Sequence, residues 1–287
     1  MVSQQLPWAS CRIYERGGLM ERITIPLNAY QLEEDKNLIE KIMNHEITQK
    51  LLTWTREQGV DEVYHTVYRS SFLKANDEIA PMLMTQLRKA CDLVGLEQVP
   101  DVFLMRDFDD TVTIGGVSAP FLLLSCRYLE VLEAEGEQVM LGVLTGQMAG
   151  IMAGHHRGLL LSWLLSTVSG LVGLNRVVLA SLEGLLNDWK RCRIYTCDRA
   201  MYLAMEDYPL AMRTILGGTV PAPILDNMHA GTEGDVYQAQ VDAFLNNSQM
   251  DEFINFANSV FSDTSWLPLR CHKLTEFVKE RKGGGSV

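Results

Sequence analysis

The sequence predicts an α+β protein that is mostly helical, with a small sheet beside one long apolar helix and a helical C-terminal part. Three observations lead to this fold class. Apolar residues recur every three or four positions over residues 31–58, as in an amphipathic helix. Three short apolar runs between residues 102 and 125 indicate strands. After Arg127 the pattern is helical almost throughout.

Composition excludes several classes of protein. The 287 residues are 47% apolar and 21% charged, so the chain can bury a sizeable core and is not expected to be disordered. The formal net charge is −11, and an acidic surface repels nucleic-acid phosphates, which excludes a general nucleic-acid binder. Six cysteines are scattered without a C-x-x-C pair, and the first residues lack the charged start and apolar run of a signal peptide. We therefore expect a cytoplasmic protein with reduced thiols.

The first half of the chain is expected to contain an arm, two helices and three strands. Prolines and glycines interrupt residues 1–29, which predicts an extended N-terminal arm. A helix is expected over residues 31–58, with Gly59 as its C-cap, and a second over residues 78–95. The expected strands are residues 102–105, 111–114 and 121–125, which suffice for a small sheet.

The second half is expected to be helical and to complete one domain over residues 30–281, followed by a flexible tail over residues 282–287. A Gly- and Pro-rich linker is expected at 217–235, but the helices after it are too few to form a second core. The expected helices are residues 128–134, 136–157, 158–186, 188–205, 208–217, 236–247, 249–261 and 268–281.

Residues 158–182 are apolar enough to raise the possibility of membrane contact. The 18 residues from 158 to 175 carry no charge, close to the ~20 that span a bilayer. Serines, a threonine and glycines dilute this run, and Arg176 follows it directly. A buried core helix is the favoured interpretation, and peripheral membrane contact is the alternative.

Two segments resemble a known family. VMLGVLTGQMAGIMAGHH (139–156) and RCRIYTCDRAMYLA (191–204), with the small sheet before them, are similar to peptidase family M forty-eight. This family comprises the HtpX-like and CAAX-prenyl-protease-like zinc metallopeptidases, or gluzincins. The resemblance extends over residues 30–281 and implies a zincin-like metallopeptidase fold. It also implies a substrate-binding edge strand before the motif helix, and the activity of a zinc metalloendopeptidase.

The residues that carry this chemistry in the family are missing here. The two histidines of the H-E-x-x-H motif fall on Gly146 and Gly150, and the glutamate falls on Gln147. The third ligand falls on Ile194, and the T-H-P-like segment falls on residues 264–266 without a histidine. A catalytic zinc needs about three protein ligands and a general base. We therefore expect a pseudoenzyme with no catalytic residue, no metal and no cofactor.

Three family-motif residues are retained, namely His155, Asp198 and Arg199. His155 follows Gly146 by nine residues, or about 2.5 helical turns, so in a continuous helix it would point to nearly the opposite face. Asp198 is expected to accept a buried hydrogen bond or to pair with an arginine, since an unpaired buried carboxylate is costly.

Glycines also recur every four residues along the motif helix, at positions 142, 146, 150 and 154. Each costs ~1 kcal/mol relative to alanine in a helix, so the stripe needs a reason. Close packing of a neighbouring helix, with Ile194 filling the space of the metal, is the favoured one. An open groove that holds a peptide is the second, and a membrane G-x-x-x-G contact is the third.

The favoured function is binding of a protein or peptide, as an adaptor, regulatory or scaffold subunit. An edge strand can pair with an extended peptide through main-chain groups alone, without zinc. The candidate positions are Val112, Thr113, Ile114, Gly115 and Gly116. The alternatives are an active zinc metalloendopeptidase with a non-standard site and a membrane-associated structural protein. The partner and the oligomeric state stay open.

Overall fold

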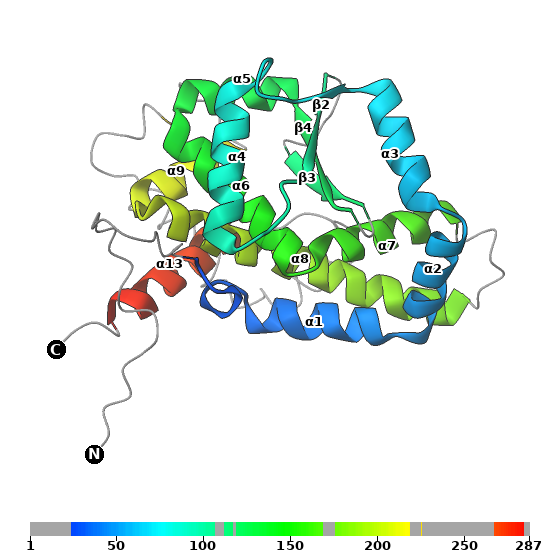
Figure 1. Ribbon diagram of the computed structural model, residues 1–287. Helices are drawn as coiled ribbons and strands as arrows, with labels where there is room; N and C mark the ends of the chain where they lie inside the picture. Colours follow the sequence, from blue (N-terminus) through cyan, green and yellow to red (C-terminus); the bar gives the residue numbers. More distant parts are fainter. Residues whose placement is uncertain are drawn as a thin grey trace, which may run out of the picture.

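The structure is a computed structural model that describes residues 24–106, 112–116, 119–168, 176–218, 225 and 267–283. Most of the expected arm, most of the linker, the two helices expected over 236–261 and the segment 264–266 lie outside the described residues. The described chain confirms a mostly helical α+β architecture with one small sheet (Figure 1).

The sheet has four strands, in the order β1-β2-β4-β3. The three expected strands are confirmed as β2 (Asp101–Met105), β3 (Val112–Gly115) and β4 (Phe121–Ser125). β2 and β4 are parallel, and β3 pairs antiparallel with β4, from Val112 opposite Leu124 to Gly115 opposite Phe121. The fourth strand, β1 (Leu73–Lys74), has only two residues, which is too short for a periodic signal. Every residue of β4 is buried, whereas β3 forms one edge of the sheet.

The first expected helix is divided in two. α1 (Glu33–Asn44) ends at His45, whose backbone is extended at φ −68° and ψ 135°, and α2 (Glu46–Glu57) begins directly after it. The His45 side chain accepts a hydrogen bond from the Ile47 amide, so a histidine acts as the N-cap of α2. α3 (Val60–Ser71) follows Gly59 and was not expected from the sequence. α4 (Pro81–Val94) confirms the second expected helix and ends at Gly95 in the left-handed conformation.

The last residues of the expected extended arm are packed against the domain. Residues 27–29 form a short 3-10 helix, η1 (Leu27–Ala29). Ile25 is buried, and its amide donates to the Leu93 carbonyl at the end of α4. The arm interpretation is therefore wrong for this part, because apolar residues at 25 and 27 contribute to the core.

The motif helix is shorter than expected, and the next helical boundary is different. α5 (Cys126–Glu135) leads into α6 (Glu137–Met152), which stops at Ala153 and Gly154, with Gly154 at φ +80°. α7 (His155–Val168) then runs in a new direction. α8 (Arg176–Met205) is one continuous helix of 30 residues, so the boundary expected near residue 187 is absent.

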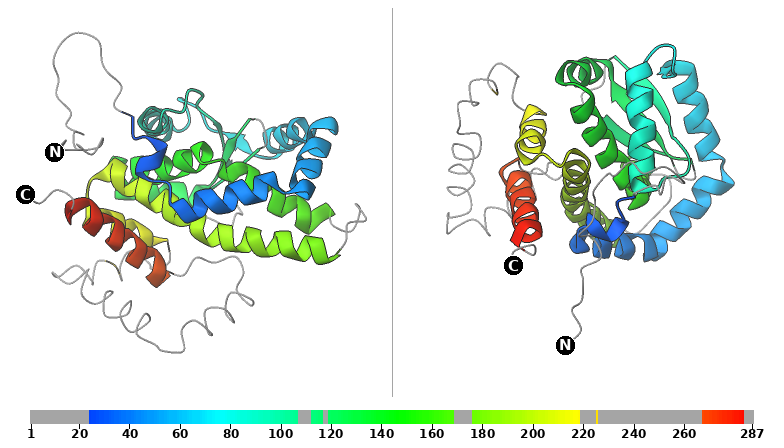
Figure 2. Two further views of the ribbon diagram at one scale, coloured as in Figure 1. Left: turned by 90° about the horizontal axis from the view of Figure 1, so that it is seen from below. Right: turned by 60° about the vertical axis from the view of Figure 1, so that its left-hand side comes forward.

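The remaining described helices cover one side of α8. α9 (Tyr208–Gly217) confirms the helix expected there, and Asp207 caps it by accepting from the Leu210 amide. α13 (Leu267–Gly283) includes the first two residues of the expected tail. Figure 2 shows α9 and α13 lying together beside the C-terminal half of α8. α6 lies between α4 and α8, so the glycine stripe is at the centre of the molecule (Figure 1).

Candidate functional site

The glycine stripe of α6 is filled by the neighbouring helix. A methyl group at Gly142 would collide with the Met205 side chain, and one at Gly146 would lie 2.9 Å from the Cys197 carbonyl oxygen. At Gly150 it would lie 3.1 Å from His155 Nδ1, 3.4 Å from Ile114 Cδ1 and 3.5 Å from Cys197 Sγ.

Close packing therefore explains three of the four glycines. The open-groove explanation is wrong at these positions, and Gly154 instead ends the helix. The expectation for Ile194 is also wrong. Cys197, and not Ile194, supplies the α8 atoms closest to Gly146 and Gly150, while Ile194 stays half-buried.

His155 lies beside the motif positions, contrary to the expectation from a continuous helix. The chain turns at Ala153 and Gly154, so His155 begins α7 and its Nδ1 lies against Gly150. The ring is fully buried, at 0% exposure, and packs edge-on against Trp189, with ring centroids 5.6 Å apart. The prediction that His155 points to the opposite face failed because a glycine with a left-handed backbone ends the helix before it.

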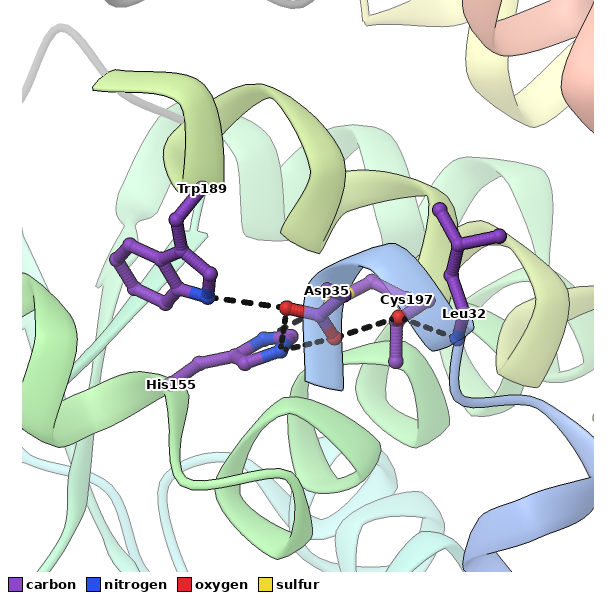
Figure 3. A network of polar contacts seen from close by, with 6 residues as sticks. Leu32, Asp35, His155, Trp189 and Cys197 are labelled. Carbon is purple, nitrogen blue, oxygen red and sulfur yellow. Dashed lines mark hydrogen bonds and ion pairs between the residues drawn. The ribbon is translucent and has the colours of Figure 1, made fainter. Parts of the chain in front are cut away.

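A buried polar network surrounds His155 and is centred on Asp35 of α1 (Figure 3). The Asp35 carboxylate is fully buried and accepts from His155 Nε2 at 2.9 Å and 3.1 Å. It also accepts from Trp189 Nε1 at 2.9 Å and from Thr196 Oγ1 at 2.7 Å. The Thr196 hydroxyl in turn accepts from the Leu32 amide at 3.1 Å, just before α1 begins. Three helices, α1, α7 and α8, are thus joined at one carboxylate.

Cys197 adjoins this network but stays a protonated thiol. Its Sγ lies 3.9 Å from His155 Nδ1, the ring nitrogen that Asp35 does not use. Burial raises the pKa of Cys197 to about 12; the nearby Arg193 opposes this rise and Asp198 adds to it. The pair is therefore a weak contact between a thiol and an imidazole, and the thiolate that nucleophilic chemistry requires is disfavoured.

The retained Asp198 and Arg199 have structural partners. Asp198 accepts from Arg270 of α13 in a two-point pair, at 2.9 Å from Nε and 2.7 Å from Nη2. The expectation that Asp198 pairs with an arginine is therefore confirmed. The Arg199 guanidinium lies 4.7 Å from the centre of the Phe277 ring, also in α13, and burial lowers the Arg199 pKa. Both residues hold the C-terminal helix against α8.

The expected edge strand lies next to the motif positions. Ile114 is buried and its side chain approaches Gly150, so β3 is adjacent to the end of α6. Gly115 lets the backbone approach the Phe121 ring, where a methyl group would be only 2.8 Å from Cζ. Gly116 has φ +94°, and a side chain there would collide with the Ala119 carbonyl. The two glycines are thus required by the turn that closes β3 onto β4.

Sequence reasoning found the helix positions but missed Asp35, Trp189 and Thr196. Asp35 lies in an acidic first turn that is typical of an exposed helix start, so nothing in its neighbourhood signals burial. Gln147, at the position of the family's catalytic glutamate, is half-buried, and no described hydrogen bond connects it to the Asp35 network.

Comparisons with protein-family models, with curated proteins and with solved structures give no match to this chain. Among the described residues, His, Cys, Asp and Glu side chains do not gather in a group of three or more that could hold a metal ion. No helix in the described part of the chain combines the length and the apolar character needed to cross a membrane.

Proposed function

We propose that this protein is a catalytically inactive relative of the zinc metallopeptidases that binds an extended protein or peptide segment at the free edge of β3. The observation that carries the proposal is the contrast between the two edges of the sheet. Binding by strand addition uses main-chain hydrogen bonds and needs no metal.

The two sheet edges differ in how well they are protected against pairing. β1 has two residues, and its Lys74 forms an ion pair with Asp101, at 2.7 Å. Short strands and lysines are common means of blocking an edge. β3 has four residues, Val112–Gly115, and contains neither a charged residue nor a proline. Its edge therefore keeps the properties of a surface that accepts another strand.

The order of elements around β3 supports the metallopeptidase-like part of the proposal. The family resemblance implies a strand, then an edge strand, then the motif helix. Here β2, the antiparallel edge strand β3, β4 and α6 follow in that order, with α5 before α6. Ile114 of β3 approaches Gly150 of α6, so the edge strand and the motif helix adjoin as the resemblance requires.

The packing of α6 supports the loss of catalysis. At Gly146 and Gly150, histidine side chains would have to occupy space that Cys197 and His155 already fill. The neutral thiol of Cys197 and the ring of His155, whose other nitrogen is bonded to Asp35, are the polar groups that adjoin Gly150. A peptidase would need a polarised water at this place.

The test is selection of peptides from a displayed library on the purified full chain, followed by proline substitution in β3. Adjacent residues of a strand direct their N–H groups to opposite sides. One of Val112→Pro and Thr113→Pro therefore removes an outward N–H, and the other disrupts pairing with β4. We expect the variant that keeps its thermal stability to lose peptide binding. Lys74→Pro, on the opposite edge, is the control and should keep binding, because Ala75 donates its N–H to β2 and the N–H of the adjacent Lys74 therefore faces outward.

Two results would overturn the proposal. One is unchanged peptide affinity in the stable β3 variant. The other is cleavage of the selected peptides that a chelator abolishes, because this would indicate a working metal site.

A further inference from the structure

The described part of the molecule contains two main hydrophobic cores. The first lies between the sheet, α4, α6, α9, α13 and the C-terminal half of α8. The second lies between α1, α2, α7 and the N-terminal half of α8 (Figure 1). Its buried members are Ile39, Ile42, Ile47, Leu51, Leu161, Leu165, Leu179, Leu182, Leu186 and Trp189. Among the described residues, Leu159 is the side chain that packs against both cores.

The described chain passes between these cores four times, and the Asp35 network connects three of the four crossings. Before α1, it passes from Tyr30 in the first core to Ile39 in the second. It passes back between Leu51 of α2 and Ala75, again at Gly154 between α6 and α7, and a fourth time within α8 between Trp189 and Ala200. Asp35 lies at the first crossing, His155 at the Gly154 crossing, and Trp189 and Thr196 at the crossing within α8. The crossing between Leu51 and Ala75 lies outside this network. At the other three crossings the hydrogen bonds of Asp35 join the cores, and Leu159 adds an apolar contact to both.

We infer that the second core opens as one cooperative unit while the first core stays folded, and that the Asp35 network is the latch between them. Local opening in proteins occurs in contiguous units of packed elements. The boundary here is polar and directional, so its hydrogen bonds are lost together when α1 and α7 move away from α8. This inference does not depend on the proposed function, because β3 belongs to the first core.

Three buried cysteines can report on this opening. Cys192 lies on the face of α8 that α1 covers, near Glu34 and Asp35. Cys91 lies in α4 within the first core, and Cys197 lies between α8 and α6. Their exposures are similar, at 7%, 2% and 7% respectively, so differences in labelling reflect which part of the structure opens. Opening of the second core uncovers Cys192 and leaves Cys91 protected, whereas Cys197 keeps the cover of α6 but loses that of His155.

The experiment is alkylation of the folded wild-type chain over a series of low urea concentrations, with each cysteine quantified by mass spectrometry. We expect Cys192 to react through an opening of lower free energy and weaker urea dependence than Cys91, since less surface is exposed. Equal free energies and equal urea dependence at the three cysteines would overturn the inference, because they would indicate one cooperative unit.

Matched variants test the latch and the boundary. Thr196→Val removes one donor to Asp35, and we expect roughly tenfold faster labelling of Cys192 with Cys91 unchanged. Leu165→Ala, in the second core, should also accelerate Cys192 alone. Leu87→Ala, a buried leucine of the first core, should leave the opening of the second core unchanged. Equal acceleration of Cys192 and Cys91 in Thr196→Val or in Leu165→Ala would contradict the inference.

Discussion

At the scale of single residues, Asp35 determines how the centre of the molecule is arranged. A buried carboxylate without donors is strongly unfavourable. This one has three side-chain donors, from His155, Trp189 and Thr196, so the network is satisfied in the folded state and broken if any part is removed. The same carboxylate fixes the ring of His155, and thereby the group that adjoins Gly150.

Replacement of Asp35 by alanine should be strongly destabilising. The change leaves the Trp189, Thr196 and His155 donors buried without their acceptor, and breaking such a network costs about 3–5 kcal/mol. Urea denaturation measures the loss in free energy of unfolding. Asp77→Ala is the control, because it removes a carboxylate from an exposed pair with Arg88, and exposed ion pairs contribute little to stability. Equal losses in the two variants would show that the Asp35 network contributes no more than a surface ion pair.

At the scale of elements, the contact between α6 and α8 depends on the absence of side chains at the glycine stripe. Gly146→Ala should destabilise the protein by about 1–3 kcal/mol, because its methyl group meets the backbone carbonyl of Cys197, which cannot rotate away. A methyl group added at Gly184, in α8, would have no atom within 4 Å. Gly184→Ala should therefore stabilise by up to about 1 kcal/mol through helix propensity alone. Thermal unfolding of Gly146→Ala and Gly184→Ala distinguishes the effect of packing from that of helix propensity. Stabilisation by both substitutions would contradict close packing at Gly146.

A second element-scale prediction concerns acid pH. Asp101 in β2 pairs with Lys74 of β1 and Arg69 of α3. Burial alone would raise its pKa, but Lys74 and Arg69 together hold the pKa below the usual 3.8. The charged form is therefore favoured by folding, so this stabilisation is present above pH 4 and is lost as the pH falls through the lowered pKa.

Asp101→Asn should accordingly reduce stability by at most about 1 kcal/mol at neutral pH, since the pairs are partly exposed. The difference from the wild type should shrink below pH 4 in a series of urea denaturations. A difference that stays constant down to pH 2 would show that the charge of Asp101 is not its cause.

How far the sequence predicts these elements depends on the kind of signal. Periodicity identified α4 and α9, and β-propensity identified β2, β3 and β4, because these elements bury a regular apolar pattern. The helix boundaries at His45 and Gly154 were harder to predict. At each of them, one residue with a non-helical backbone interrupts a sequence pattern that is continuously helical. The Asp35 network could not be predicted, because Asp35 and Thr196 are 161 residues apart and none of its members lies in a distinctive motif.

At the scale of the whole molecule, the elements follow the order that the family resemblance implies. Their centre, however, is filled by packed side chains. The face of α6 where the resemblance places two zinc ligands is closed by Cys197, His155 and Ile114. The β3 edge, in contrast, has neither the shortness nor the charge that would block strand pairing. Our central claim is therefore that the chain binds its partner without a metal.

The most direct test is the metal content of the purified, untagged protein by elemental mass spectrometry. We predict less than about 0.1 zinc per chain, because a zinc site needs about three protein ligands and no group of three or more His, Cys, Asp or Glu side chains gathers among the described residues. A value close to one zinc per chain would contradict the claim. Such a result would mean that His155 and Cys197, 3.9 Å apart, are ligands rather than packing groups.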